Sequence, residues 1–595
     1  MIDCHTYSPQ IPNKRMAQRF LLIAAVAAIS LATSFAQVPV FAQTPNEPSS
    51  TRDDIYAPDH LLDVRIQVDP ADWDRLRHQT RSLMASLAED NSSGSPFEYV
   101  AADVTIDGRL IENVGIRKKG FLGSLDNDRP SLKIRFDEFQ DQAPFGDLDR
   151  LTLNNNKQDP SRLSQYLSYE MFRRAGVPCS LCNFAKVTVN GKKLGIYSNV
   201  EAIKPPMLNR AFGEGSGLLF EGTVTDFIPG TVDRFEMKTK KGDRDQLQQI
   251  ASLLAANPLD IDRLDTLIDT ESFLRFWAVE SLIGFWDGYT HNQNNFYLYR
   301  NPSDSKFYFL PWGTDSAFTD FVPPIIEKIA HRSFHSNATI ANRLYRKRET
   351  RNEYLATLRH LLDGPWDEEE IADEIERVRA LLADETLDAN AFSKAVDGVH
   401  AFVRNRRKVI EDELQRFPIP LRTGPRRPGF TRVLGKVTAN FETQWSKPRF
   451  FQSGFQGDAE IQLVVDGKPV PLRNMRAAAA YKSANFGKKK SDAPTLTLSA
   501  VREADATPLS FSLAFSPADF KTSGRPVPCT GLFIEGSMIT FMAMMSANPS
   551  AIKLVDGTAN LDEASIDEGA AVTGSANFRI MSFAGGEKEN VEWEE

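Results

Sequence analysis

Polar residues suited to binding a metal ion gather within residues 286–318. Asp287 opens this segment, Asn292 follows it, and Asp315 lies beyond an expected β-hairpin over 295–310. A hairpin brings the start of its first strand beside the end of its second, so Asn292 and Asp315 should meet at one end. Asp287 should reach the same point from a preceding helix. Two carboxylates and a carboxamide at one point favour a hard divalent cation, and Mg²⁺ on substrate phosphates is the common case.

The spacing within this segment is a further signal. Asp287 and Asn292 form an Asp-x-x-x-x-Asn pattern, the spacing of the protein-kinase catalytic loop. There the Asp accepts the proton of the substrate hydroxyl, the Asn holds one Mg²⁺ and a later Asp holds another. The pattern gains weight because Lys133, Glu170 and Asp315 stand in kinase order around it. The alternative interpretation is that these residues only form turns and helix caps.

Three expected elements would position these groups. Lys133 lies on a strand over 131–136, on the face opposite the apolar residues. Glu170 falls on the inner face of an amphipathic helix over about 161–175. A helix over about 270–285 leads into the polar segment, and Asp269 should cap its start.

In these features the sequence resembles the spore-coat CotH family of atypical, secreted protein kinases. The likeness covers about residues 60–416 and does not include the C-terminal region. The segments that carry it are Val114–Gly120, Ser131–Phe136, Val189–Tyr197, Trp286–Tyr299 and Leu310–Asp315.

The resemblance implies a minimised kinase-like α+β fold that transfers the γ-phosphoryl group of ATP to protein Ser or Thr, with Mg²⁺ or Mn²⁺. It implies that Lys133 holds the α- and β-phosphates and that Glu170 orients this lysine. It places Lys119 and Gly120 in the loop that covers the phosphates.

The resemblance also assigns the catalytic segment. It makes Asp287 the catalytic acid of the loop, and it makes Asn292 and Asp315 metal ligands. Many family members have Pro-Trp-Asp-x-Asp where this chain has Gly313 in place of the first acid. If the ligand is the second acid, Asp315 is intact. If it is the first, the chain would be a pseudokinase or a surface or coat binding protein without phosphoryl transfer.

Composition restricts the class of protein. Of 595 residues, 41% are apolar and 25% are charged, as in ordinary globular proteins. The 79 acids and 70 bases give a net charge of -9, which argues against a nucleic-acid partner. Among four cysteines, Cys179 and Cys182 form a C-x-x-C pair. In an exported protein this pair predicts a local disulfide.

The two ends of the chain differ from its middle. A basic stretch before the apolar segment Phe20–Ala32 predicts a cleaved export signal, hence an extracytoplasmic protein without a stable membrane span. The last region alternates apolar and polar residues at sandwich-like spacing, which predicts an all-β accessory domain. The expected division is a signal peptide over 1–36 (alternatively to 42), a linker over 37–56, a kinase-like domain over 57–416, a Pro/Gly-rich linker over 417–429 and a β-rich domain over 430–595.

Overall fold

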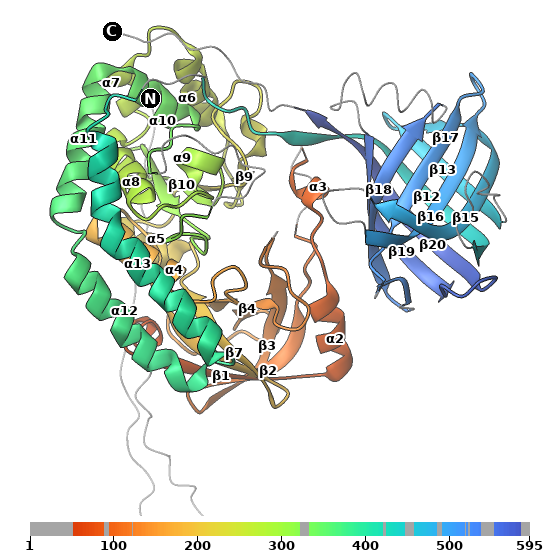
Figure 1. Ribbon diagram of the computed structural model, residues 1–595, viewed down its shortest axis with the longest axis horizontal. Coiled ribbons are helices and arrows are strands. Elements are labelled where there is room, and N and C mark those ends of the chain that lie inside the picture. Colours follow the sequence, from red (N-terminus) through yellow and green to blue (C-terminus); the bar gives the residue numbers. More distant parts are fainter. Residues whose placement is uncertain are drawn as a thin grey trace, which may run out of the picture. The chain divides into compact units, whose positions relative to one another are not determined.

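The computed structural model describes residues 51–88, 95–121, 123–321, 333–419, 424–446, 457–484, 491–517, 519–521, 524–536 and 553–584 (Figure 1). The predicted signal peptide lies outside these ranges. Within them, no helix is both long enough and apolar enough to cross a membrane.

The first part of the fold is a closed barrel of seven strands, in the order β1-β2-β3-β4-β5-β7-β6 (Figure 1). Only β1 and β6 pair in parallel. Alternate residues of the strands, such as Val64, Val104 and Ile134, are fully buried inside the barrel. The bounds are β1 Leu61–Val68, β2 Val100–Ile106, β3 Arg109–Lys119, β4 Ser131–Arg135, β5 Arg150–Asn154, β6 Cys182–Val189 and β7 Lys192–Val200.

Short helices flank the barrel strands, and α4 lies between β5 and β6 in sequence. Helix α4 covers Leu163–Arg174, so the expected helix is present and ends just before Gly176. The short helices are α1 Arg52–Ile55, α2 Pro70–His78 and α3 Leu83–Ser86.

The second part combines a small sheet with helices. Its strands follow the order β11-β10-β8-β9, and β10 and β11 form the hairpin expected from the sequence. The strands are β8 Leu218–Gly222, β9 Glu236–Met237, β10 Phe296–Arg300 and β11 Phe307–Pro311. The helices are α5 Pro205–Phe212, α6 Asp245–Ala255, α7 Ile261–Asp265, α8 Thr270–Leu282, α9 Tyr289–Asn292, α10 Thr339–Arg346, α11 Arg348–Asp363, α12 Glu368–Leu382 and α13 Ala389–Leu414, with 3-10 turns at Val232–Arg234 and Ala383–Glu385.

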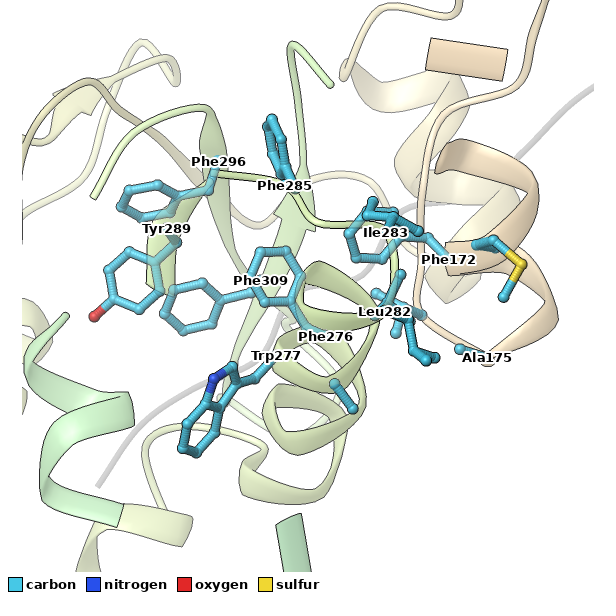
Figure 2. Packing of buried hydrophobic residues seen from close by; sticks show 14 of the residues in the cluster. Phe172, Ala175, Phe276, Trp277, Leu282, Ile283, Phe285, Tyr289, Phe296 and Phe309 are labelled. Carbon is cyan, nitrogen blue, oxygen red and sulfur yellow. The ribbon is translucent and has the colours of Figure 1, made fainter. Parts of the chain in front are cut away.

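Aromatic packing fixes the segment between α8 and β11 (Figure 2). The ring of Phe309 on β11 lies 4.8 Å from that of Tyr289 on α9 and 5.5 Å from that of Phe276 on α8. Asp269 caps α8, as predicted, by accepting a hydrogen bond from the backbone N–H of Ser272 at 2.8 Å. The core therefore holds both ends of the polar segment that the sequence singles out.

The C-terminal region is all-β, as predicted, but it is not a sandwich of two facing sheets. Its nine strands form one sheet in the order β12-β20-β19-β18-β17-β16-β15-β13-β14. Strand β12 also pairs with β13 and β15, so the two ends of the sheet join. The strands are β12 Phe430–Ser446, β13 Gly457–Val465, β14 Lys468–Val470, β15 Leu472–Ala484, β16 Ser491–Arg502, β17 Pro508–Ala514, β18 Pro526–Glu535, β19 Lys553–Ala564 and β20 Ala571–Ala584, with a 3-10 turn at Asp519–Lys521.

The expected disulfide between Cys179 and Cys182 is not formed. Both cysteines are buried free thiols. The Cys179 thiol donates to the backbone oxygen of Tyr169 at 3.3 Å, and burial raises the pKa of both thiols. The pair therefore packs as small apolar residues against α4.

Candidate active site

Asp287 lies between α8 and α9, enclosed by three carboxamides. Its Oδ1 accepts hydrogen bonds from Asn292 Nδ2 at 2.6 Å and Asn294 Nδ2 at 3.2 Å. Its Oδ2 accepts one from Asn295 Nδ2 at 2.8 Å. Burial raises the pKa of Asp287, and the three carboxamides and the charge of Arg426 oppose that rise. The cage fixes the direction of both carboxylate oxygens.

A buried glutamate holds the helix that follows. Glu280 accepts hydrogen bonds from the backbone N–H of Tyr289 at 2.8 Å, and from the N–H and hydroxyl of Thr290 at 2.9 and 2.5 Å. Burial raises its pKa to about 7. A Cβ at position 288 would lie 2.2 Å from Glu280 Oε1, so only Gly288 fits beside Asp287. Glu280 is thus a positioning residue for Asp287.

A further buried carboxylate supports α9 from its other end. Asp226 accepts hydrogen bonds from the Tyr289 hydroxyl at 2.8 Å, from Gln293 Nε2 at 2.7 Å and from the N–H of Thr339 at 2.7 Å. Sequence reasoning missed both Asp226 and Glu280. For Glu280 a signal exists, because an acid in the apolar run Phe276–Leu282 must find donors if it is buried.

Asp315 lies in the loop after β11. Its Oδ2 accepts a hydrogen bond from Gln158 Nε2 at 3.3 Å. Burial raises the pKa of Asp315 to about 6, and the charges of Asp287 and Asp159 add to the rise. The structure therefore brings Asp287 and Asp315 within electrostatic reach of each other, in a donor set that suits a hard cation.

Asn292 does not face the cleft as the sequence analysis expects. Arg426, on the segment after α13, donates from Nη2 to Asn292 Oδ1 and to its backbone oxygen, both at 2.8 Å. The carboxamide oxygen predicted to bind a metal is thus already engaged. Instead, Asn294 and Asn295 line the cleft together with Asp287. Sequence spacing could not distinguish these nearby asparagines.

Lys133 lines the same cleft, among other cations. Burial lowers its pKa well below the usual value, and Arg117, Lys119 and Arg150 lower it further. The charge of Glu221, on β8, partly opposes this. Cations that repel one another in a half-buried site require an anion between them, and phosphate is the common one.

Lys119 and Gly120 lie at the end of β3, beside the same cleft. Lys119 Nζ donates to Asn154 Oδ1. Burial lowers the pKa of Lys119 to about 8, and the charge of Asp315 opposes the shift. Gly120 has φ +127°, and a Cβ there would lie 2.8 Å from Ser124 Oγ. The loop needs glycine at this point.

Glu170 does not orient Lys133 in this structure. Its carboxylate is engaged by Arg173 on the same helix, at a partly exposed position. From α4, the side chain that reaches the cleft is Gln165, whose Oε1 accepts from Asn154 Nδ2 at 2.5 Å. The helix was predicted correctly, but the face that it presents to the cleft was not.

The cleft has a volume of about 360 Å³ and is lined by seven basic and four acidic side chains. Among the described residues, no group of three or more His, Cys, Asp or Glu side chains is placed to hold a metal ion by itself. The arrangement suits a polyanion that arrives with its own cation. We call Arg117, Lys119, Lys133 and Arg150 the basic wall. The same cleft is lined by the candidate site residues Asp287, Asn294, Asn295 and Asp315 and by the further charged residues Arg81, Lys204, Lys238, Glu221 and Glu236.

The loop around Gly313 disfavours an acidic side chain at this position. Gly313 has φ +55°, and a Cβ would lie 2.7 Å from Asn295 Oδ1. We expect Gly313→Asp to lower the free energy of unfolding by about 2–4 kcal/mol, because backbone strain and a close contact add. Urea unfolding measures the change. Gly176→Asp is the control, since Gly176 has φ +69° and open space. Equal losses in both variants would contradict the role of the contact.

Comparisons with known proteins place part of the chain in a family. A model of the family described as CotH kinase protein matches residues 116–410. Invasin CotH2 of Rhizopus delemar is 28% identical over 194 residues, which cover 29% of this chain and 33% of that protein. Inner spore coat protein H of Bacillus subtilis is 22% identical over 299 residues, which cover 46% of this chain and 81% of that protein. The chain thus spans about a third of the length of the fungal relative.

A structural comparison adds one distant neighbour. The HipA, HipB and operator DNA complex of a Shewanella oneidensis toxin–antitoxin system is 13% identical and covers 51% of this chain and 68% of that chain. The TM-score is 0.23, so it carries no argument here. The family match therefore defines the domain: residues 116–410 of this chain are a CotH kinase protein domain.

Proposed function

We propose that this protein is an exported, ATP- and metal-dependent phosphotransferase that acts on Ser or Thr of proteins. The observation that carries the proposal is the cleft, which the cations of the basic wall line together with the carboxylates of Asp287 and Asp315. Membership of the CotH kinase family supports it, and the relatives named for spore coats and invasion support a place outside the cytoplasm.

In this mechanism the basic wall binds the phosphates of ATP. Lys119 and Lys133 neutralise charge on those phosphates, and this positioning provides most of the catalysis. Asp287 accepts the proton of the acceptor hydroxyl. Its carboxamide cage keeps the carboxylate oriented, and the three hydrogen bonds oppose the rise that burial causes in its pKa.

The metal ion fits the remaining donors. Burial and the nearby charge of Asp287 raise the pKa of Asp315. A cation bound beside Asp315 would favour its ionised form. Such a cation would supply positive charge against the phosphates of ATP. On the protein side, Asp315 and the cleft-lining carboxamide of Asn295 would hold it, rather than Asn292.

Transfer from γ-labelled ATP tests the proposal. Casein and the protein itself are the acceptors, with Mg²⁺ or Mn²⁺, for the wild type and Asp315→Asn. We expect transfer by the wild type and its loss in the variant. Absence of transfer with both metals, by a folded protein that still binds ATP, would favour a pseudokinase that serves as a surface or coat binding protein.

Nucleotide binding should depend on pH through Lys119. Its pKa of about 8 means that roughly half of the free protein lacks this charge at pH 8. Bound phosphate raises that pKa, so ATP binding takes up protons and its affinity falls as the pH rises above 8. Calorimetry at pH 8 in two buffers of different ionisation enthalpy measures the uptake. Lys119→Met should remove this contribution, and identical heats for the wild type in both buffers would contradict it.

A further inference from the structure

A larger cavity, of about 610 Å³, adjoins the cleft. Asp315 and Gln158 line both spaces, so the cavity opens beside the carboxylate that faces the reaction. The residues around it come from the 315–321 loop, the start of α4 and one face of α13. We call it the α13 pocket.

Small residues on α13 create the volume. Ala395, Gly398 and Ala401 lie along its pocket face, and a Cβ at Gly398 would meet nothing within 4 Å. The floor is apolar and includes the buried rings of Phe318 and Phe402.

An exposed aromatic residue lies at the rim of the α13 pocket. Phe321 is 62% exposed there and continues the apolar surface of the floor. An apolar side chain inserted here would cover Phe321 and the floor together.

Two buried polar atoms in the α13 pocket have no hydrogen-bond partner among the described residues. They are the indole Nε1 of Trp286 and the hydroxyl of Ser316, a residue that is 9% exposed. Trp286 directly precedes Asp287, and Ser316 directly follows Asp315. Buried donors are normally satisfied, so an acceptor from a bound ligand would meet an unfilled hydrogen-bonding capacity here. A backbone carbonyl of an extended peptide supplies one.

The charges at the α13 pocket select among peptides. Asp315 lines it, and Asp320 is exposed at its rim. The nearby cation, Arg406, donates to the backbone oxygens of Leu282 and Ser281, so its hydrogen bonds are already committed. Acidic side chains are therefore repelled and basic ones are attracted.

We propose that the α13 pocket binds the acceptor protein itself, as a peptide segment with an apolar side chain close to the phosphorylated Ser or Thr and without acidic neighbours. This inference rests on the proposed function and names its substrate class. The apolar side chain fills the space beside α13, backbone carbonyls meet Trp286 and Ser316, and the acceptor hydroxyl is directed towards Asp287.

Selectivity among peptides tests the proposal. Labelled nine-residue peptides with a central Ser form two pools, in which the flanking positions contain Leu and Lys or Asp and Glu. We expect the first pool to bind at least about tenfold more tightly by fluorescence anisotropy, and to be phosphorylated preferentially. Equal binding of both pools would overturn the proposal.

Filling the pocket provides the matched variant. Gly398→Trp should remove the preference between pools and raise the KM for the Leu and Lys pool about tenfold or more, with the KM for ATP unchanged. Arg404→Trp, at an exposed α13 position away from the pocket, is the control. If Gly398→Trp fails to fold, Ala395→Phe fills the same face. Retained preference in a folded filled variant would contradict the assignment.

The two measurements separate this inference from the proposed function. Selective binding that Gly398→Trp abolishes, without any phosphate transfer, would leave the α13 pocket as a peptide site and refute the kinase. Phosphate transfer without a preference between the two peptide pools would support the proposed kinase activity and refute the assignment of the α13 pocket as the peptide site.

Discussion

Asp287→Asn should reduce phosphoryl transfer by about 10²–10⁴-fold, because the variant cannot accept the proton of the acceptor hydroxyl. The size and shape of the side chain are kept, although one oxygen that accepts hydrogen bonds becomes a donor. Single-turnover transfer from labelled ATP measures the loss.

Two further measurements make the Asp287 result specific. ATP should still raise the melting temperature of the variant, since the basic wall is unchanged. Asp262→Asn, an exposed carboxylate on α7, should transfer phosphate at the wild-type rate. Transfer by Asp287→Asn within about threefold of wild type would assign the proton to another group.

Glu280→Ala should cost about 4 kcal/mol or more of unfolding free energy. It leaves two backbone N–H groups and the Thr290 hydroxyl buried without their acceptor, and each such loss costs about 1–3 kcal/mol. Urea unfolding measures the change. Glu353→Ala, at an exposed position on α11, should remain within about 0.5 kcal/mol of wild type.

Glu280 also gives stability a defined pH dependence. Burial raises its pKa to about 7, above its ordinary value near 4.5, so the folded protein holds this proton more tightly than the unfolded chain. Its contribution to stability is therefore greatest below pH 4.5 and decreases as the pH rises to 7. The difference in stability between wild type and Glu280→Gln should favour wild type less at pH 8 than at pH 5. A constant difference would mean that Glu280 stays ionised throughout.

The fold follows from local patterns where those patterns are strong. The α8 cap at Asp269 and the hairpin over 295–310 both appear near their expected positions. Each depends on residues close in sequence, whose periodicity and turn chemistry are visible in the chain itself. The closure of the β-rich sheet was not predictable, because β12 joins strands from both ends of its region.

The sequence indicates which residues gather at the candidate site, but not how each side chain is oriented there. Asp287, Asp315, Lys119 and Lys133 all reach one cleft, as motif order indicates. Glu170 points away from the cleft. Successive helix residues turn by about 100°, so a small error in assigning the inner face of the helix puts the wrong side chain in the cleft.

The surroundings of His291 show why contacts between residues distant in sequence cannot be predicted from local patterns. The His291 ring is buried, and its centroid lies 3.9 Å from that of the stacked His335 ring. Arg426 is another example, since it meets Asn292 from 134 positions away. No pattern in the neighbouring sequence indicates that His335 contacts His291 or that Arg426 contacts Asn292.

The bonds from Arg426 to Asn292 bear on how proteins of this kind can be recombined. Arg426 follows the end of α13 by twelve residues and precedes β12 by four, so the chain outside the helices supplies a charge that acts on Asp287. An exchange of C-terminal regions between relatives at residue 416 would discard that charge. A chimera that keeps this charge therefore needs its junction after Arg426. The β-rich region cannot be exchanged together with the whole segment that precedes it without losing a contact of the candidate site.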